Sequence, residues 1–145
     1  MSTEQDGLTA ALRAEYAAVY AYGIVQAYSL APRQTSAAEF VDAHRAQRDA
    51  LAAALTATGT TPPAAAAAYN LPTQVTDPTS AAKLAVTAED ECAQAYRVLL
   101  ADAGDDGDRR LALTGLTGAA TRAARWRIAL NVTPSTPPFP GSKDQ

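Results

Sequence analysis

Alanine is the residue that most constrains this chain, because it occupies 36 of the 145 positions, against only 2 Phe and 1 Trp. Alanine has the highest helix propensity, and its small side chain lets neighbouring helices pack closely. Valine, isoleucine, threonine and aromatic residues never alternate over a sustained run, as they would in a half-buried strand. The sequence therefore predicts an all-α fold.

Four segments carry the start and stop signals of helices. We expect helices at about 6–31, 36–58, 79–103 and 107–131, which together form one bundle domain over residues 1–131. Pro32 is expected to end the first helix, since proline disrupts a helix interior. Ser36 followed by Glu39 is a capping-box pattern that is expected to start the second helix.

The connections between these segments differ in length, and this difference predicts the topology. The joins after the first and third helices are short, whereas residues 60–78 form a long connection with four prolines. Fully extended, that connection reaches on the order of 60 Å, and a helix of 24 residues is only about 36 Å long. We therefore expect two antiparallel hairpins joined by a long crossover, which is the arrangement of ferritin-like four-helix bundles.

Charge and hydropathy exclude several classes of function. A net charge of -3 with only two lysines argues against nucleic-acid binding. No segment approaches the ~20 apolar residues of a membrane span, and the first residues lack the pattern of a signal peptide, so we expect a cytoplasmic protein with no membrane partner. The single cysteine, Cys92, is expected to be a small buried hydrophobe. Residues 132–145 form a Pro-rich tail that is either disordered or docked on the bundle through Phe139.

A shift of 74 residues superimposes the first helix on the third and the second on the fourth. At this offset three rarer residue types agree, which indicates an internal repeat: Glu15 with Glu89, Tyr22 with Tyr96, and Arg48 with Arg122. Helical spacing places both glutamates in apolar stripes, although on stripe position alone they could also be ordinary, partly exposed residues. We therefore expect a polar constellation in the core, composed of Glu15, Tyr22, His44, Arg48, Glu89, Tyr96 and Arg122.

The segments EYAAVYAYG, HRAQRDAL, EDECAQAYRVLL and RAARWR resemble an uncharacterised, alanine-rich actinobacterial family that is assigned to the ferritin-like superfamily. The resemblance covers nearly the whole chain, and it implies a fold rather than a known activity. Ferritin-like di-metal proteins carry a Glu on helices one and three and a Glu-x-x-His motif on helices two and four. This sequence departs from that pattern, because Val41 stands three residues before His44 and residues 109–131 contain no Asp, Glu, His or Cys.

The departure bears directly on metal binding. Two divalent ions need about four carboxylates and two imidazoles, so we expect no di-metal centre and no cofactor. Inward carboxylates then need other partners, and Glu15–Arg48 and Glu89–Arg122 share a separation of 33 residues, which predicts two quasi-symmetric Glu–Arg pairs. In the alternative, Glu15, His44 and Glu89 hold one Fe or Mn ion.

Two further features of the fourth helix carry predictions. Gly115 and Gly118 each cost about 1 kcal/mol relative to alanine, which indicates a close approach of another group. The repeat places Gly118 opposite His44, so we expect His44 to fill that space. Trp126 is expected to be a packing residue among arginines 122, 125 and 127, and this arginine cluster is, in the alternative, an anion site.

The leading hypothesis is a ferritin-like bundle that has lost its di-metal centre and acts as a binding or structural protein, with a homodimer through its alanine-rich faces. The alternative is a metal-dependent oxidoreductase with an atypical centre built on Glu15, His44 and Glu89. A third hypothesis is small-molecule binding in the bundle core. The missing donor side chains of the fourth helix separate the first two, and whether the protein is an enzyme stays open.

Overall fold

The computed structural model describes residues 1–143, which contain four α-helices and no strand. The helices are α1 (Thr3–Tyr28), α2 (Ala31–Ala57), α3 (Pro78–Asp102) and α4 (Asp106–Ala129). The prediction of an all-α fold is confirmed. Within the described residues, none of the helices is long and apolar enough to cross a membrane.

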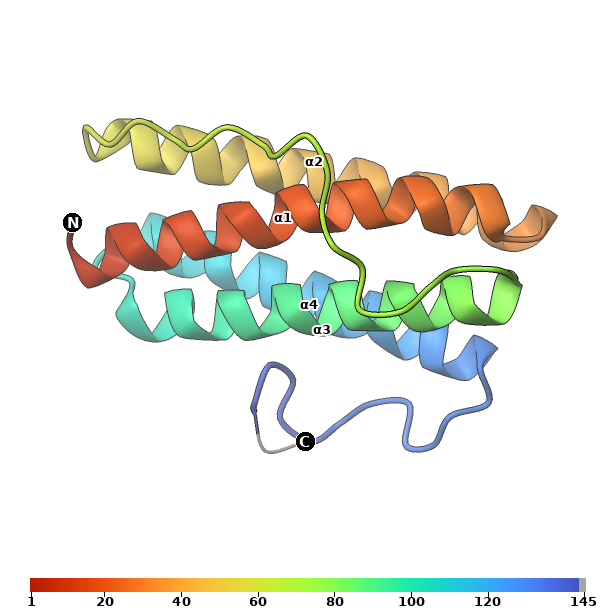
Figure 1. Ribbon diagram of the computed structural model, residues 1–145. Coiled ribbons are helices and arrows are strands. Elements are labelled where there is room, and N and C mark those ends of the chain that lie inside the picture. The colour runs from red at the N-terminus through yellow and green to blue at the C-terminus, as the bar shows by residue number, and fades with distance from the viewer. Residues whose placement is uncertain (144–145) are drawn as a thin grey trace.

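The four helices form a bundle of two antiparallel pairs (Figure 1). α1 packs against α2 and α3, and α3 packs against α4, whereas the interface between α2 and α4 is sparse. The connection at 58–77 runs back along α2 and crosses α1 before it enters α3, so α2 and α3 point in the same direction. All four helices therefore contribute their inward faces to one shared core.

Side-chain caps fix the starts of three helices. Ser2 and Asp77 each form a capping box with the residue three positions later, and the Asp105 side chain accepts a hydrogen bond from the Asp108 backbone N–H at 2.9 Å. The start of α2 differs from the prediction. Pro32 lies in the first turn of α2, where the missing N–H breaks no helical hydrogen bond, and so it does not end α1.

The predicted capping box at Ser36 is wrong for the same reason. α2 begins five residues earlier, at Ala31 with Leu30 as its N-cap, so Ser36 already lies inside the helix. There its hydroxyl donates to the Pro32 carbonyl oxygen at 3.5 Å. Joining α1 to α2 through only Ser29 and Leu30 keeps the two helices in close antiparallel contact.

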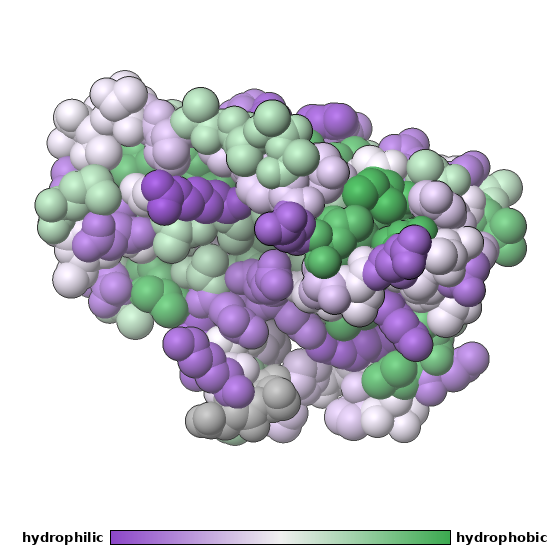
Figure 2. All heavy atoms as spheres, in the orientation of Figure 1, coloured by the Kyte–Doolittle hydropathy of each residue, from purple (hydrophilic) through white to green (hydrophobic). Residues whose placement is uncertain are grey.

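Alanine fills the core and also covers much of the surface. Buried alanines occur on every helix, among them Ala11, Ala37, Ala85 and Ala119, each fully excluded from solvent. On the face shown in Figure 2, weakly hydrophobic patches alternate with hydrophilic side chains, and the exposed run 64–68 of the long connection consists of alanine alone. Small side chains therefore allow close helix contacts, whereas several large apolar side chains, among them Leu30, Ile128 and Phe139, stay exposed.

The described part of the tail is docked on α3. Arg97 donates from Nη1 to the Pro140 carbonyl oxygen at 3.2 Å. Gly141 has φ +80°, and a Cβ there would lie 2.5 Å from the Ala93 carbonyl oxygen. Phe139 is 64% exposed, so the docking predicted through this ring is made instead by the backbone that follows it. The last two residues of the predicted 132–145 tail lie outside the described residues.

Candidate functional site

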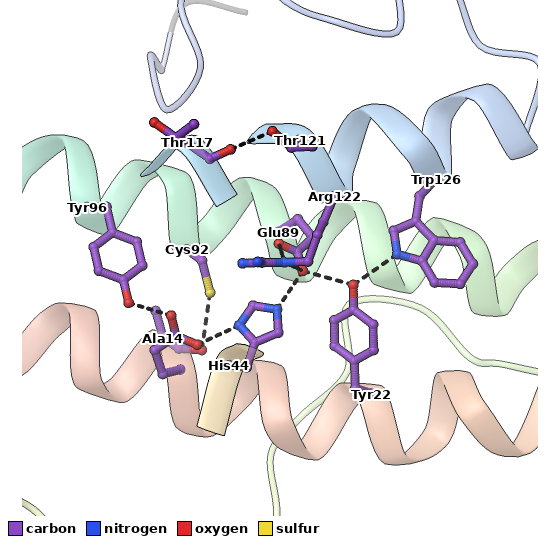
Figure 3. Close-up of polar contacts among 11 residues, drawn as sticks. Ala14, Tyr22, His44, Glu89, Cys92, Tyr96, Thr117, Thr121, Arg122 and Trp126 are labelled. Atoms are coloured by element: carbon purple, nitrogen blue, oxygen red, sulfur yellow. Dashed lines mark hydrogen bonds and ion pairs between the residues drawn. The ribbon is translucent and has the colours of Figure 1, made fainter. Parts of the chain in front are cut away.

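A cluster of charged side chains is buried halfway along the bundle, with one member from each helix (Figure 3). Glu15, His44 and Glu89, from α1, α2 and α3, have no exposed surface, and Arg122 of α4 is 9% exposed. The apolar stripes place them there, since Leu12, Val41 and Leu99 on the same helix faces are also buried. The expectation that the two glutamates face the core is confirmed.

His44 lies between the two carboxylates. Its Nδ1 is 2.5 Å from Oε2 of Glu15, and its Nε2 is 2.5 Å from Oε1 of Glu89. Ionised carboxylates only accept hydrogen bonds, so both ring nitrogens donate and the ring is an imidazolium. Burial alone would lower the pKa of His44, but the hydrogen bonds to Glu15 and Glu89 outweigh it and raise the pKa to about 9. At neutral pH this ring is therefore a cation.

Glu89 has a second cationic partner in Arg122. The guanidinium Nε donates to both carboxylate oxygens, at 2.9 and 3.0 Å. Burial alone would lower the pKa of Arg122, but the adjacent Glu89 charge raises it above its usual value. Two carboxylates, one imidazolium and one guanidinium cancel to zero net charge, which is the condition under which four ionised groups can share a buried site.

Two tyrosines complete the network by binding across the bundle. Tyr96 of α3 donates to Oε1 of Glu15 at 2.5 Å, and Tyr22 of α1 donates to Oε1 of Glu89 at 2.8 Å. Burial, together with the neighbouring carboxylates, raises the pKa of both phenols, so they stay protonated as donors. The hydrogen bonds expected from these tyrosines are present, and each reaches the glutamate of the other repeat.

Trp126 is a member of this network that the sequence reasoning did not identify. Its Nε1 donates to the Tyr22 hydroxyl at 2.9 Å, while its ring packs against Phe40 at a centroid distance of 6.2 Å. The cation–π contact in this region is made by Arg125 over Phe40, not over Trp126. The signal was available, since a buried indole N–H needs an acceptor and Trp126 follows Arg122 by one helical turn.

The predicted Glu15–Arg48 pair is wrong. The Arg48 side chain is 30% exposed, and its Nε donates to Oδ1 of Asp49 at 2.8 Å. The reason lies one turn earlier in each helix. His44 occupies the space beside Glu15, whereas its repeat equivalent in α4 is Gly118, which leaves room for a guanidinium to fold inward.

The space beside Gly118 is therefore occupied by a different side chain from the one expected. A Cβ at this position would lie 2.9 Å from Nη1 of Arg122, so Arg122 takes the place that His44 was predicted to fill. Gly115 gives the same kind of space to Tyr96, whose ring atoms would lie 2.3 to 2.5 Å from a Cβ there. Gly115 and Gly118 are thus both required by close contacts with the network.

The donor set does not fit a pair of divalent metal ions. Among the described residues, three buried side chains offer potential ligand atoms that all lie within 4.8 Å of one another: Glu15, His44 and Cys92. The third member of this group is therefore Cys92, whereas the prediction named Glu89. Burial raises the pKa of the Cys92 thiol, and the two glutamates raise it further, which keeps it protonated. At this site α4 places a guanidinium in place of a carboxylate or an imidazole, and that positive charge would repel a second cation.

Comparison with known proteins identifies a family and a closely similar solved structure. A family model described as a domain of unknown function, DUF4439, matches residues 7–144. The chain is similar to the crystal structure of a conserved hypothetical protein, rv2844, from Mycobacterium tuberculosis, with 40% identity and a TM-score of 0.87 over 95% of this chain and 97% of that chain. No curated protein matches the sequence.

Proposed function

The chain belongs to the family described as a domain of unknown function, DUF4439, and from this premise we propose that it is a ferritin-like bundle without a di-metal centre. A neutral network of Glu15, His44, Glu89 and Arg122 takes the place of the metals. The protein then acts as a binding or structural protein rather than in redox chemistry. Association of two copies through alanine-rich helix faces is part of this proposal.

The position of His44 carries the proposal. Both of its ring nitrogens, together with one oxygen of each glutamate, are used in hydrogen bonds of 2.5 Å. A metal ion would need the same lone pairs, so it has to displace a proton that the site holds up to a pH of about 9. Exchange of that one proton for a divalent ion would leave the buried site with a net positive charge beside Arg122, which is unfavourable.

A second candidate is a metal-dependent oxidoreductase with one Fe or Mn ion, built on Glu15, His44 and Glu89. One observation favours it, which is that Glu15 and His44 lie with Cys92 in a buried group of potential ligand atoms within 4.8 Å. Ferritin-like centres hold two ions with six protein ligands, four of them carboxylates that can be shared between the ions, whereas this group offers a single ion three ligands. The two candidates therefore differ in a measurable quantity, the affinity for Fe(II) or Mn(II) at neutral pH.

Metal analysis of the purified protein tests the proposal. Mass spectrometry after expression in iron- and manganese-supplemented medium should find far less than one ion per chain. Thermal unfolding in excess Fe(II), without oxygen, or in excess Mn(II) should match unfolding in EDTA, whereas a site saturated at 100 times its dissociation constant would gain about 2.7 kcal/mol. One or two ions per chain that disappear in Glu15→Gln would overturn the proposal and support the oxidoreductase.

A further inference from the structure

We propose that the seam between α2 and α4 holds a binding site for a small oxyanion, of the carboxylate or phosphate class. A cavity of about 70 Å³ opens there, several times the space that one ordered water needs. It is lined by Arg33, Ser36, Phe40, Arg125, Trp126 and Ala129. This inference rests on the binding role proposed above and specifies its ligand class, but the site is built from residues other than the four charged groups of the buried network.

No salt bridge within the described residues balances the charges of the two arginines that line the cavity. Among residues 1–143, Arg33 and Arg125 take part in no salt bridge, whereas four other arginines each pair with an aspartate: Arg45, Arg48, Arg109 and Arg127. Arg33 uses Nη2 to donate to the Ala129 carbonyl oxygen at 3.3 Å, and Arg125 lies 5.7 Å from the centre of the Phe40 ring. Each guanidinium carries five N–H donors, so both keep donors for an oxyanion.

Only one member of the arginine cluster predicted from the sequence belongs to this site. Arg122 binds Glu89 and Arg127 binds Asp90, so their charges are already balanced. The partner of Arg125 at the cavity is Arg33, which comes from the first turns of α2 and is 92 positions away in sequence. The sparse packing between α2 and α4 leaves the space between these two side chains.

The floor of the cavity is formed by two aromatic side chains. Phe40 and Trp126 are 8% and 3% exposed, and their rings meet edge to face. Apolar walls lower the local dielectric, which strengthens hydrogen bonds between a guanidinium and an oxyanion. The same Trp126 donates to Tyr22, which in turn donates to Glu89. An occupant of the cavity therefore contacts a ring that is hydrogen-bonded to the buried network.

Trp126 also provides the test, because it lines the cavity and is the only tryptophan of the chain, so a change in tryptophan fluorescence comes from its surroundings. Inorganic phosphate and benzoate are titrated separately at constant ionic strength, with sodium chloride as the control, so that a phosphate ligand is distinguished from a carboxylate. We expect a saturable fluorescence change with at least one probe and a dissociation constant of about 1 mM or below, as for a small anion held by two arginines.

Substitutions assign the change to the two arginines. Arg33→Gln and Arg125→Gln should each weaken binding about tenfold. Arg45→Gln is the matched control, since Arg45 pairs with Asp42 on an exposed part of the same helix as Arg33, and it should bind like the parent. Far-UV circular dichroism checks that each variant is folded. Absence of a saturable change with both probes, or unchanged binding in both cavity variants, overturns the site. Metal analysis is unaffected by either result, so this inference and the proposed function fail separately.

Discussion

His44 should make the stability of the protein depend on pH over a window where most side chains do not titrate. The folded protein holds the imidazole proton up to a pH of about 9, because Glu15 and Glu89 accept from both ring nitrogens, whereas the unfolded chain releases it near pH 6.5. Below pH 6.5 both states carry the proton, and its stabilising contribution is fully present. As pH rises towards 9, only the folded state keeps the proton, and the contribution is lost.

The magnitude follows from the two pKa values. One proton released on unfolding lowers the free energy of unfolding by about 1.4 kcal/mol for each pH unit. Between pH 6.5 and about 9 the loss is therefore about 3 kcal/mol, and above that range this group causes no further change. A loss of this size is a substantial part of the 5–15 kcal/mol that is typical of a domain's stability.

Two measurements check this prediction. Urea unfolding between about pH 6 and pH 10 gives the free energy at each pH, and His44→Gln is the control, in which the slope between pH 6.5 and 9 should disappear. NMR of the ring protons gives the pKa directly, and the signal needs no assignment because the chain has one histidine. A pKa at or below 6.5 in the folded protein would refute the imidazolium bridge even if the variant fails to fold.

Two further predictions concern α4. Arg122→Met should destabilise the fold by about 3–5 kcal/mol, because it leaves the buried Glu89 with one cation fewer, and adding Glu89→Gln should recover much of the loss in a double-mutant cycle followed by urea unfolding. Equal, additive losses would contradict the pairing. Gly115→Ala should destabilise the fold by about 1–3 kcal/mol, because the added Cβ would overlap the Tyr96 ring. Gly23→Ala is the control and should stabilise the fold by about 0.5–1 kcal/mol, because no atom lies within 4 Å of its added Cβ. Thermal melts that show the same change in stability for both variants would refute the packing argument.

The helical content was predictable because local signals and tertiary packing agree over most of the chain. The alanine-rich segments form helices as expected, and α3 begins one residue before the predicted start at 79, because Asp77 is its N-cap and Pro78 its first residue. The connection between α1 and α2 was predicted wrongly because a proline is compatible with two positions near a helix. A proline can follow the end of one helix or lie in the first turn of the next. Here Pro32 lies in the first turn of α2, and the chain reverses at Ser29–Leu30, with Ser29 and Ala37 buried on either side.

The buried network was predictable in composition but only partly in pairing. Stripe positions are a property of one helix, so the inward direction of Glu15, Glu89 and His44 follows from spacing alone. Which cation meets which carboxylate depends on side-chain volume across helices. The repeat suggested two equivalent arginines, but His44 stands one turn before Arg48 and Gly118 one turn before Arg122, so only Arg122 has room to fold inward towards Glu89.

Gly118 and Arg122 therefore act as one unit, and no single substitution at either position is expected to complete a metal site. A histidine at position 118, which would give the second repeat its own imidazole, would place its Cβ 2.9 Å from Nη1 of Arg122 and displace the guanidinium. Removal of the guanidinium alone takes a cation from Glu89 without adding a ligand. Each of these single substitutions is therefore expected to lower the stability of the fold without supplying a complete set of metal ligands.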